Sequence, residues 1–202
     1  MHSKNKLSAK NRYLIWRANF SIPGLLGRFD EKKVVSFVTA INGGLAILVL
    51  SLFAWLTDLP LAFPALGPSA FILFSSPLSI AAAPRNVIMG HWISLATGFI
   101  IWNLVSYCSG AAVSLQSGNW PLLCSASLTM AVSSVLLLRL SCPHPPACAS
   151  GLVVGLGAII AWPDLLVIAV AVVCLTYQAY AMNRLAGLPV PVWSPRHIDI
   201  PA

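Results

Sequence analysis

Charged residues are the scarcest component of this sequence. Only 8% of its 202 residues are charged and 58% are hydrophobic, and five Asp and Glu residues stand against twelve Lys and Arg. Soluble globular domains carry about 25% charged residues, so this composition excludes an ordinary soluble protein. The sequence instead predicts a protein embedded in a lipid bilayer.

Two further absences narrow the class of protein. The five cysteines are odd in number and scattered through apolar sequence, which argues against a disulfide framework. The first long apolar run begins at Val34 and is too long for a cleavable signal peptide. The formal net charge of +7 is concentrated in residues 1–33, where basic residues indicate a cytoplasmic or interfacial membrane flank and not a nucleic-acid-binding patch.

Apolar sequence is present as six consecutive segments. Four are long enough to cross a hydrocarbon core of about 30 Å as helices, and two are short and interrupted by proline and glycine. The order long, short, long occurs twice. The predicted long segments are 34–56, 86–108, 120–140 and 165–185, and the short ones are 61–75 and 147–162.

The few charges between these segments favour six membrane crossings. If the N-terminus is inside and all six cross, the four remaining Arg residues fall inside and two Asp residues fall outside, as the positive-inside rule requires. If only the long segments cross, two of the Arg residues lie outside with the acids. The inner residues are Arg85, Arg139, Arg184 and Arg196, and the outer ones are Asp58 and Asp164.

The predicted fold is therefore an all-α polytopic membrane protein. Its halves, 34–108 and 120–185, start on opposite sides of the membrane and would form an inverted repeat of three plus three segments. The cytoplasmic or interfacial segment 1–33 precedes this domain, and a proline-rich cytoplasmic tail, 186–202, follows it. We expect a bacterial-type inner membrane location with both termini in the cytoplasm.

Broken segments in equivalent positions of two repeats point to a substrate site. Pro68 and Pro146 each stand at a plausible first helical position. Proline also disfavours helical dihedrals in the residue before it, so extended backbone is expected up to Pro146. Each helix start leaves about four amides without intrahelical partners and carries about +0.5 charge, which attracts an anion. The alternative is that these prolines only kink tightly packed helices.

Two histidines and one arginine lie where they could serve such a site. His91 is inside the second long segment, and an ionisable residue within a membrane helix suggests a polar pathway. His144 precedes the second broken helix, where it could donate to a ligand or titrate near neutral pH. Arg85 would suit a bidentate anion contact, with Asn86 beside it. The structural alternatives are a topology anchor for Arg85 and hydrogen bonds between helices for the histidines.

Three motifs resemble the HPP family of small integral membrane proteins, which is named for the triplet 144–146. They are the stretch 144–147, the stretch 67–74 and the stretch 83–91, and they cover about residues 60–160 in the order of the family. Some members are described as nitrite transporters, so the resemblance implies transport of a small anion. The chain departs from the family in Pro68, Cys148 and Ser150.

We therefore predict a transporter or channel for a small inorganic anion, nitrite first and nitrate second, held at the starts of the two broken helices. Its partners would be the anion and the lipid bilayer, with a homo-oligomer left open and no nucleic acid or cofactor. The alternative is a membrane-embedded enzyme or a metal- or cofactor-binding subunit, against which the absence of carboxylates within the segments argues. The predicted substrate-binding residues are Gly67, Pro68, Ser69, Ala70, Arg85, Asn86, His91, His144, Pro145, Pro146, Ala147 and Cys148.

Overall fold

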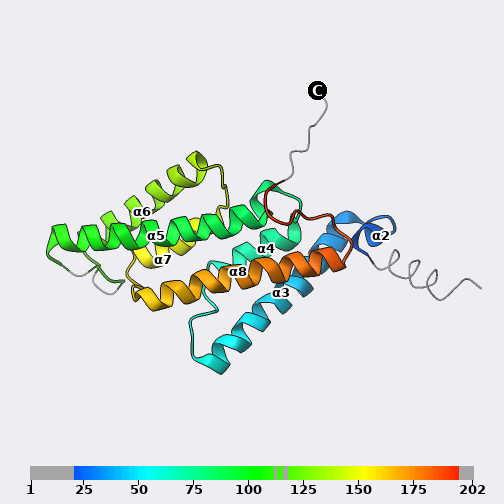
Figure 1. Cartoon of the computed structure of the whole chain (residues 1–202), viewed down its shortest axis with the longest axis horizontal. Coiled ribbons are helices and arrows are strands. Elements are labelled where there is room, and N and C mark those ends of the chain that lie inside the picture. The colour runs from blue at the N-terminus through cyan, green and yellow to red at the C-terminus, as the bar shows by residue number, and fades with distance from the viewer. Residues whose placement is uncertain (1–20, 112, 116–117, 196–202) are drawn as a thin grey trace, which may run out of the picture.

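A computed structural model describes residues 21–111, 113–115 and 118–195. In these ranges the chain forms helices and one 3-10 turn, and no strand (Figure 1). The all-helical prediction is confirmed, while Arg196 and most of the N-terminal segment lie outside the described residues. The elements are α2 (Ile22–Leu26), α3 (Glu31–Thr57), α4 (Leu66–Ser75), η1 (Ile80–Ala82), α5 (Pro84–Ser109), α6 (Trp120–Arg139), α7 (Pro146–Gly155) and α8 (Trp162–Leu185).

Four of these helices, α3, α5, α6 and α8, are long and apolar enough to cross a membrane. Two shorter apolar helices, α4 and α7, have ten residues each. At a rise of about 1.5 Å per residue each is about 15 Å long, half of a hydrocarbon core. The predicted order of long, short and long helices is therefore present in both halves of the chain.

Local signals set the helix ends. The Asp30 side chain accepts a hydrogen bond from the Lys33 amide at 3.2 Å, which caps the start of α3. Pro84 is the first residue of α5, where its missing N–H costs nothing. Gly110 ends α5 in the left-handed conformation, with φ 62°, which glycine adopts without strain.

Both short helices are shorter than the sequence predicted. In 61–75 the helix begins only at Leu66, so Pro68 is its third residue and not its first. A proline is still tolerated there because the first-turn amides have no intrahelical partner. The segment predicted as 147–162 is helical only to Gly155. It ends there because Gly157 has φ 71° and packs its backbone against the Val113 carbonyl.

The proline cluster departs from the predicted extended backbone at one residue. Pro145 has φ −52° and ψ −39°, which are helical values, although Pro146 follows it. The preference before proline is a bias that tertiary contacts can override. Here the carbonyls of His144 and Pro145 accept hydrogen bonds from the amides of Ala147 and Cys148 at 2.9 and 3.1 Å, so the chain turns one residue early.

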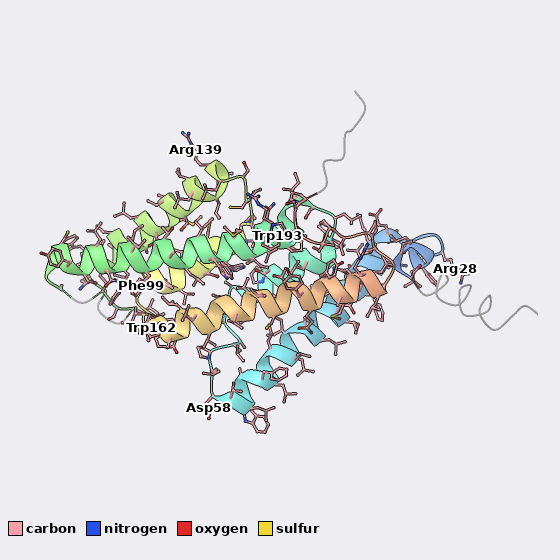
Figure 2. All side chains as sticks on the ribbon, viewed as in Figure 1. Arg28, Asp58, Phe99, Arg139, Trp162 and Trp193 are labelled. Carbon is pink, nitrogen blue, oxygen red and sulfur yellow. The ribbon has the colours of Figure 1, made fainter. Side chains whose placement is uncertain are left out.

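Successive helices run in alternating directions around α5. The Arg85 guanidinium donates to the carbonyls of Leu140 and Ser141, which places the start of α5 beside the end of α6. The start of α2 likewise lies beside the end of α8, where the Ile22 amide donates to Ala186. Figure 1 shows α3 leaning away from the other long helices, and Figure 2 shows Asp58 at its far end.

Buried apolar and buried polar side chains occupy different regions. The main apolar core lies between α3, α4, α5 and α8 and includes Leu66, Ile168 and Leu175. Fully buried hydroxyl and imidazole groups are concentrated on α5, α6 and α7. These polar residues include His91, Ser94, Ser125, Thr129, Ser133 and Ser150, each with 0% of its surface exposed.

Candidate functional site

Four polar side chains from four parts of the chain meet in the protein interior. Ser69 of α4 lies between His91 of α5 and His144, which precedes α7, and Ser150 of α7 is on the far side of His91. The Ser69 Oγ is 2.9 Å from His91 Nε2 and 3.1 Å from His144 Nε2. The Ser150 Oγ is 2.6 Å from His91 Nδ1. None of the four has exposed surface, so together they form a serine–histidine cluster sealed from solvent.

A backbone carbonyl fixes one end of this cluster. His144 Nδ1 is 2.8 Å from the carbonyl oxygen of Ala81 in η1. A carbonyl can only accept, so His144 Nδ1 carries a hydrogen and donates it. His144 lies in the loop between α6 and α7, where burial lowers its pKa to about 4, while the bond to Ala81 raises it. His144 is therefore neutral at pH 7.

Close packing of α5 against α7 holds the two imidazoles together. The ring centroids of His91 and His144 are 5.1 Å apart. A Cβ atom added at Gly90 would lie 3.3 Å from the Cβ atoms of both His144 and Ala147. About two turns further along, Gly98 of α5 lies directly against the backbone carbonyl of Gly151. Only glycine allows backbones to approach so closely, which explains the small residues repeated every four positions on α7.

A stripe of small hydroxyl residues on α6, four positions apart, completes this packing. The Ser125 Oγ donates to the Gly155 carbonyl at 2.6 Å. Thr129 faces Gly155, because its side chain has the atoms nearest to a Cβ built there, and Ser133 Oγ lies 3.3 Å from a Cβ built at Gly151. These hydroxyl residues therefore pack α6 against α7.

Acidic groups are absent from the neighbourhood of the cluster among the described residues. The described acids are at helix ends: Asp30 and Glu31 at the start of α3, Asp58 at its end, and Asp164 in the first turn of α8. No group of three or more His, Cys, Asp and Glu side chains in the described ranges could hold a metal ion. The polar chemistry of the cluster thus rests on imidazole and hydroxyl groups alone.

An open cavity of about 230 Å³ reaches the outer side of His144. It lies between α6 and the start of α7, and its wall is mostly apolar. Its polar atoms include Ser134 Oγ and Cys148 Sγ, which are 3.9 Å apart. The lining residues are Met130, Ser134, Leu137, Leu138, Pro143, His144, Pro145 and Cys148.

The predicted site residues separate into four places: the cluster, the cavity, the groove and the start of α5. Ser69, His91 and His144 are brought together in the cluster, with Ala147 packed beside them. Cys148 and Pro145 line the cavity, and Pro146 is buried as the first residue of α7. The groove between α3 and α4 is lined by Gly67 and Ala70, while Pro68 is exposed.

Arg85 and Asn86 form a separate structural group at the start of α5. The Arg85 Nη atoms donate to the Leu140 and Ser141 carbonyls at 3.3 and 2.8 Å, and Nη1 also donates to Asn86 Oδ1. Asn86 Nδ2 in turn donates to the Ile80 carbonyl at 2.8 Å. These bonds join the start of α5 to the end of α6, so the guanidinium is directed at backbone carbonyls there and not at the imidazoles.

The first-turn amides of the short helices are already hydrogen-bonded, contrary to the expectation that they are unpaired. In α4 the Leu66 and Gly67 amides donate to carbonyls three residues back, at 3.1 and 3.3 Å. In α7 the Ala147 and Cys148 amides do the same. The first turns therefore have 3-10 hydrogen bonds, and the dipole of each helix is unchanged. Because these amides are occupied, a ligand would receive hydrogen bonds from side chains.

Ser150 is the member of the cluster that sequence reasoning did not select. It appeared there only as a departure from the family pattern. Its place on the α5 side of α7, beside the small residues Ala147 and Gly151, is the signal that could have found it. Nothing in the sequence could have identified Ala81, because it contributes a backbone carbonyl, which every residue has.

The comparisons with known proteins bear on the whole membrane domain. The family model described as the HPP transmembrane region matches residues 30–191. The chain is also 32% identical over 94 residues to a transmembrane protein of Dictyostelium discoideum. That alignment covers 46% of this chain and 30% of the relative, so the chain spans about a third of that protein. No solved structure matches the chain.

Proposed function

Because the chain belongs to the HPP family of transmembrane proteins, with four helices that can span a bilayer, we propose that it transports a small inorganic anion. Nitrite is the first candidate and nitrate the second. The observation that carries this proposal is the meeting of the two short helices at a buried cluster of two imidazoles and two hydroxyls. The substrate would bind at this cluster.

The chemistry of the cluster favours an anion over a cation. The starts of α4 and α7 both face it, so the positive ends of two helix dipoles converge there. The side chains offer N–H and O–H donors, and none of the four is a carboxylate. A cation would find no negative charge to replace its hydration shell, whereas a small anion would find convergent donors.

The proposed architecture is an inverted repeat in which α3, α4 and α5 correspond to α6, α7 and α8. The helix contacts support it, because exchanging the two halves leaves the same set of pairs. The contact of α5 with α7 is matched by that of α8 with α4. The contact of α5 with α6 is likewise matched by that of α8 with α3. Alternating access would come from a movement of α4, which has an open groove beside it, while the close contact of α5 with α7 is kept.

The proposed topology has six crossings, with both termini and the two loops at Arg85 and Arg139 in the cytoplasm of a bacterial-type inner membrane. Single cysteines placed at residues 78 and 161 of a cysteine-free chain would be labelled from opposite sides of sealed vesicles. Labelling of both from one side would exclude six crossings.

The central test is uptake of ¹⁵N-labelled nitrite by liposomes that contain the purified full chain. Saturable uptake above protein-free liposomes is expected, with the anion recovered unchanged, whereas an enzyme would alter it. Ser69→Ala should reduce the rate about tenfold, since one charge-assisted contact is worth about 1.5–3 kcal/mol. Ser75→Ala, on the same helix but in the groove, is the matched control. Equal rates for the two variants would place the substrate elsewhere.

A further inference from the structure

The contacts of the serine–histidine cluster determine where its hydrogens lie. Neutral His144 donates from Nδ1 to Ala81, so its Nε2 is an acceptor. The Ser69 hydroxyl has two acceptors within reach, this nitrogen at 3.1 Å and the Ala65 carbonyl at 3.0 Å, and donation to the nitrogen is the arrangement that gives His144 Nε2 a partner. Ser69 has a single hydrogen, so His91 Nε2 must then be the donor toward Ser69 Oγ. Neutral His91 accepts at Nδ1, and the Ser150 hydroxyl supplies that bond.

The neutral cluster is therefore one directed chain of hydrogen bonds. It runs from the Ser150 hydroxyl to His91, from His91 to Ser69, from Ser69 to His144, and from His144 to the Ala81 carbonyl. Each group donates once toward the next. The two imidazoles are consequently opposite tautomers, with the hydrogen on Nδ1 in His144 and on Nε2 in His91.

The same atoms also accommodate one additional proton without losing a hydrogen bond. The Ser69 Oγ lies 3.0 Å from the carbonyl of Ala65, one turn back in α4. If His144 becomes an imidazolium, its Nε2 donates to Ser69 Oγ, which then accepts from both imidazoles. The Ser69 hydroxyl hydrogen rotates to the Ala65 carbonyl. The heavy atoms stay in place, and every donated hydrogen still has an acceptor.

A second proton does not fit. Protonation of His91 at Nδ1 would require Ser150 to accept instead of donate, and would place two positive charges on rings 5.1 Å apart. Like charges at this distance in a buried site strongly disfavour double protonation. The cluster thus has two fully bonded states that differ by one proton.

The singly protonated state lacks a counter-ion in the described structure. The buried titratable groups near it are the thiols of Cys142 and Cys148, and the nearby charged group is Arg85, which is itself positive. The other titratable or charged groups on α5 and α6 are exposed and none is an acid: Tyr107, Cys108, Cys124 and Arg139. Burial raises the pKa of the Cys142 thiol, against the lowering effect of Arg85, so this thiol stays neutral. The buried imidazolium can therefore be balanced only by a negative charge that enters from outside the protein.

We propose that the Ser69–His91–His144–Ser150 cluster is a binding site for a single proton, and that this proton moves together with the anion at a ratio of one to one. The inference rests on the proposed transport function and names its coupling ion. The anion favours the imidazolium and so raises the low pKa of His144, and the imidazolium by linkage favours the anion. Each step transfers one proton from bulk water to His144 Nε2 and returns it on the other side, with no net charge moved.

The first experiment measures the hydrogens directly. Nitrogen NMR of ¹⁵N-histidine-labelled full chain in lipid nanodiscs at pH 8 should show one imidazole of each tautomer in the cluster. Variants His91→Gln and His144→Gln assign the signals and separate them from His2 and His197. Saturating nitrite at pH 6.5 should convert one cluster imidazole, and only one, to imidazolium. Identical tautomers, charging of both rings, or no change with nitrite would overturn the proposal.

The second experiment measures coupling in proteoliposomes whose membrane potential is clamped at zero with potassium and valinomycin. An inward proton gradient of one pH unit should drive nitrite toward an accumulation of about tenfold, the limit for one proton per anion. Nitrous acid leaking through lipid approaches the same limit, so the readout is the initial rate of uptake in excess of protein-free liposomes. His144→Gln should lose the acceleration by the pH gradient and keep downhill flux. Ser133→Ala, a buried hydroxyl on α6 with no hydrogen-bond partner among the described residues, should retain both.

The two proposals fail differently in this assay. Wild-type liposomes that take up no nitrite or nitrate under any gradient would overturn the transport function itself. Uptake that is saturable but follows the membrane potential and ignores the pH gradient would leave transport standing and overturn proton coupling. Acceleration of His144→Gln by the pH gradient equal to that of wild type would move the proton to another group.

Discussion

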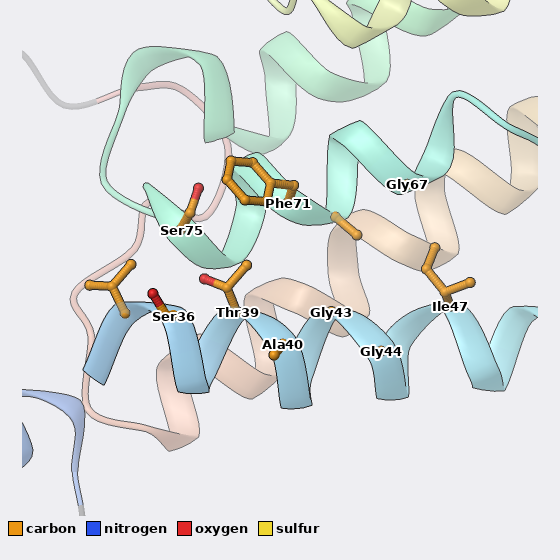
Figure 3. Close-up of a pocket in the computed structure, with 11 residues that line it drawn as sticks. Ser36, Thr39, Ala40, Gly43, Gly44, Ile47, Gly67, Phe71 and Ser75 are labelled. Atoms are coloured by element: carbon orange, nitrogen blue, oxygen red, sulfur yellow. The ribbon is translucent and has the colours of Figure 1, made fainter. Parts of the chain in front are cut away.

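The two short helices have the same length and equivalent places in the chain, but α7 is packed closely against its neighbours whereas α4 has an open groove on one side. On one side, α7 meets α5 and α6 through Gly98, Gly151 and Gly155, with the backbones in contact. On the other side, α4 meets α3 across an open groove of about 640 Å³ (Figure 3). A Cβ atom added at Gly44 or Gly67 in that region would meet nothing within 4 Å.

This difference shows which part of the molecule is fixed and which has room to move. The contact of α7 with α5 cannot slide, because glycine backbones and buried hydroxyls interlock there. The groove leaves open space on the side of α4 that faces α3, while the opposite face of α4 is buried in the apolar core. Since Ser69 of α4 reaches across to both imidazoles, a shift of α4 would open the cluster while α5 and α7 stay together.

The largest expected difference in stability is between two glycine-to-alanine substitutions, one in each short helix. The Cβ atom of Gly151→Ala would lie 2.7 Å from the Ser94 carbonyl oxygen, and backbone cannot yield cheaply. We expect this variant to lose about 3 kcal/mol of unfolding free energy, the upper range for overpacking. Gly67→Ala should be neutral or slightly stabilising. Denaturant titration in micelles compares the two, and equal losses would show that both helices are packed alike.

A second pair of substitutions tests whether the Thr129 side chain packs directly against Gly155. Gly155→Ala would bring its Cβ 2.5 Å from Thr129 Oγ1, a clash that should cost about 2 kcal/mol. Thr129→Ala alone should cost less than about 1 kcal/mol, because that hydroxyl has no hydrogen-bond partner. The double variant should recover part of the loss, since the clashing oxygen is gone. Strictly additive losses in the double-mutant cycle would contradict direct contact.

A smaller effect is expected from two hydroxyl deletions on α4. Ser69→Ala leaves the facing nitrogen atoms of His91 and His144 without their shared partner, at a cost of about 1–3 kcal/mol. Ser75→Ala, which faces the groove, should change the unfolding free energy by less than about 0.5 kcal/mol. Thermal unfolding followed by tryptophan fluorescence distinguishes them. Similar midpoints would mean that the Ser69 contacts contribute no stability.

The smallest effect is expected for a substitution on the exposed α3 side of the groove. Ala40→Leu on α3 adds apolar volume to an exposed, open position, so stability should stay within about 0.5 kcal/mol of wild type. Nitrite flux should fall more than stability if α4 must move into this space. Unchanged flux would show that α4 does not use the groove during transport.

Much of the fold was readable from local chemistry. Helix starts at Pro84 and Pro146, the left-handed end at Gly110, and the order of long and short helices follow from proline, glycine and apolar runs. The lengths of the short helices did not, since Gly157 ends α7 by packing against a carbonyl from another loop. Pro145 likewise adopts helical dihedrals against its local preference.

The sequence by itself determined that the chain is a helical membrane protein, that two of its helices are broken, and that Ser69, His91 and His144 are polar residues in apolar surroundings. Those properties depend on side-chain chemistry and on neighbours within one or two turns. Only the tertiary structure decided that Arg85 binds carbonyls of the α6 end, that Ser150 joins the cluster, and that Ala81 fixes the tautomer of His144. These contacts join residues more than 50 positions apart, and hydrogen-bond direction depends on which acceptor folding brings within reach.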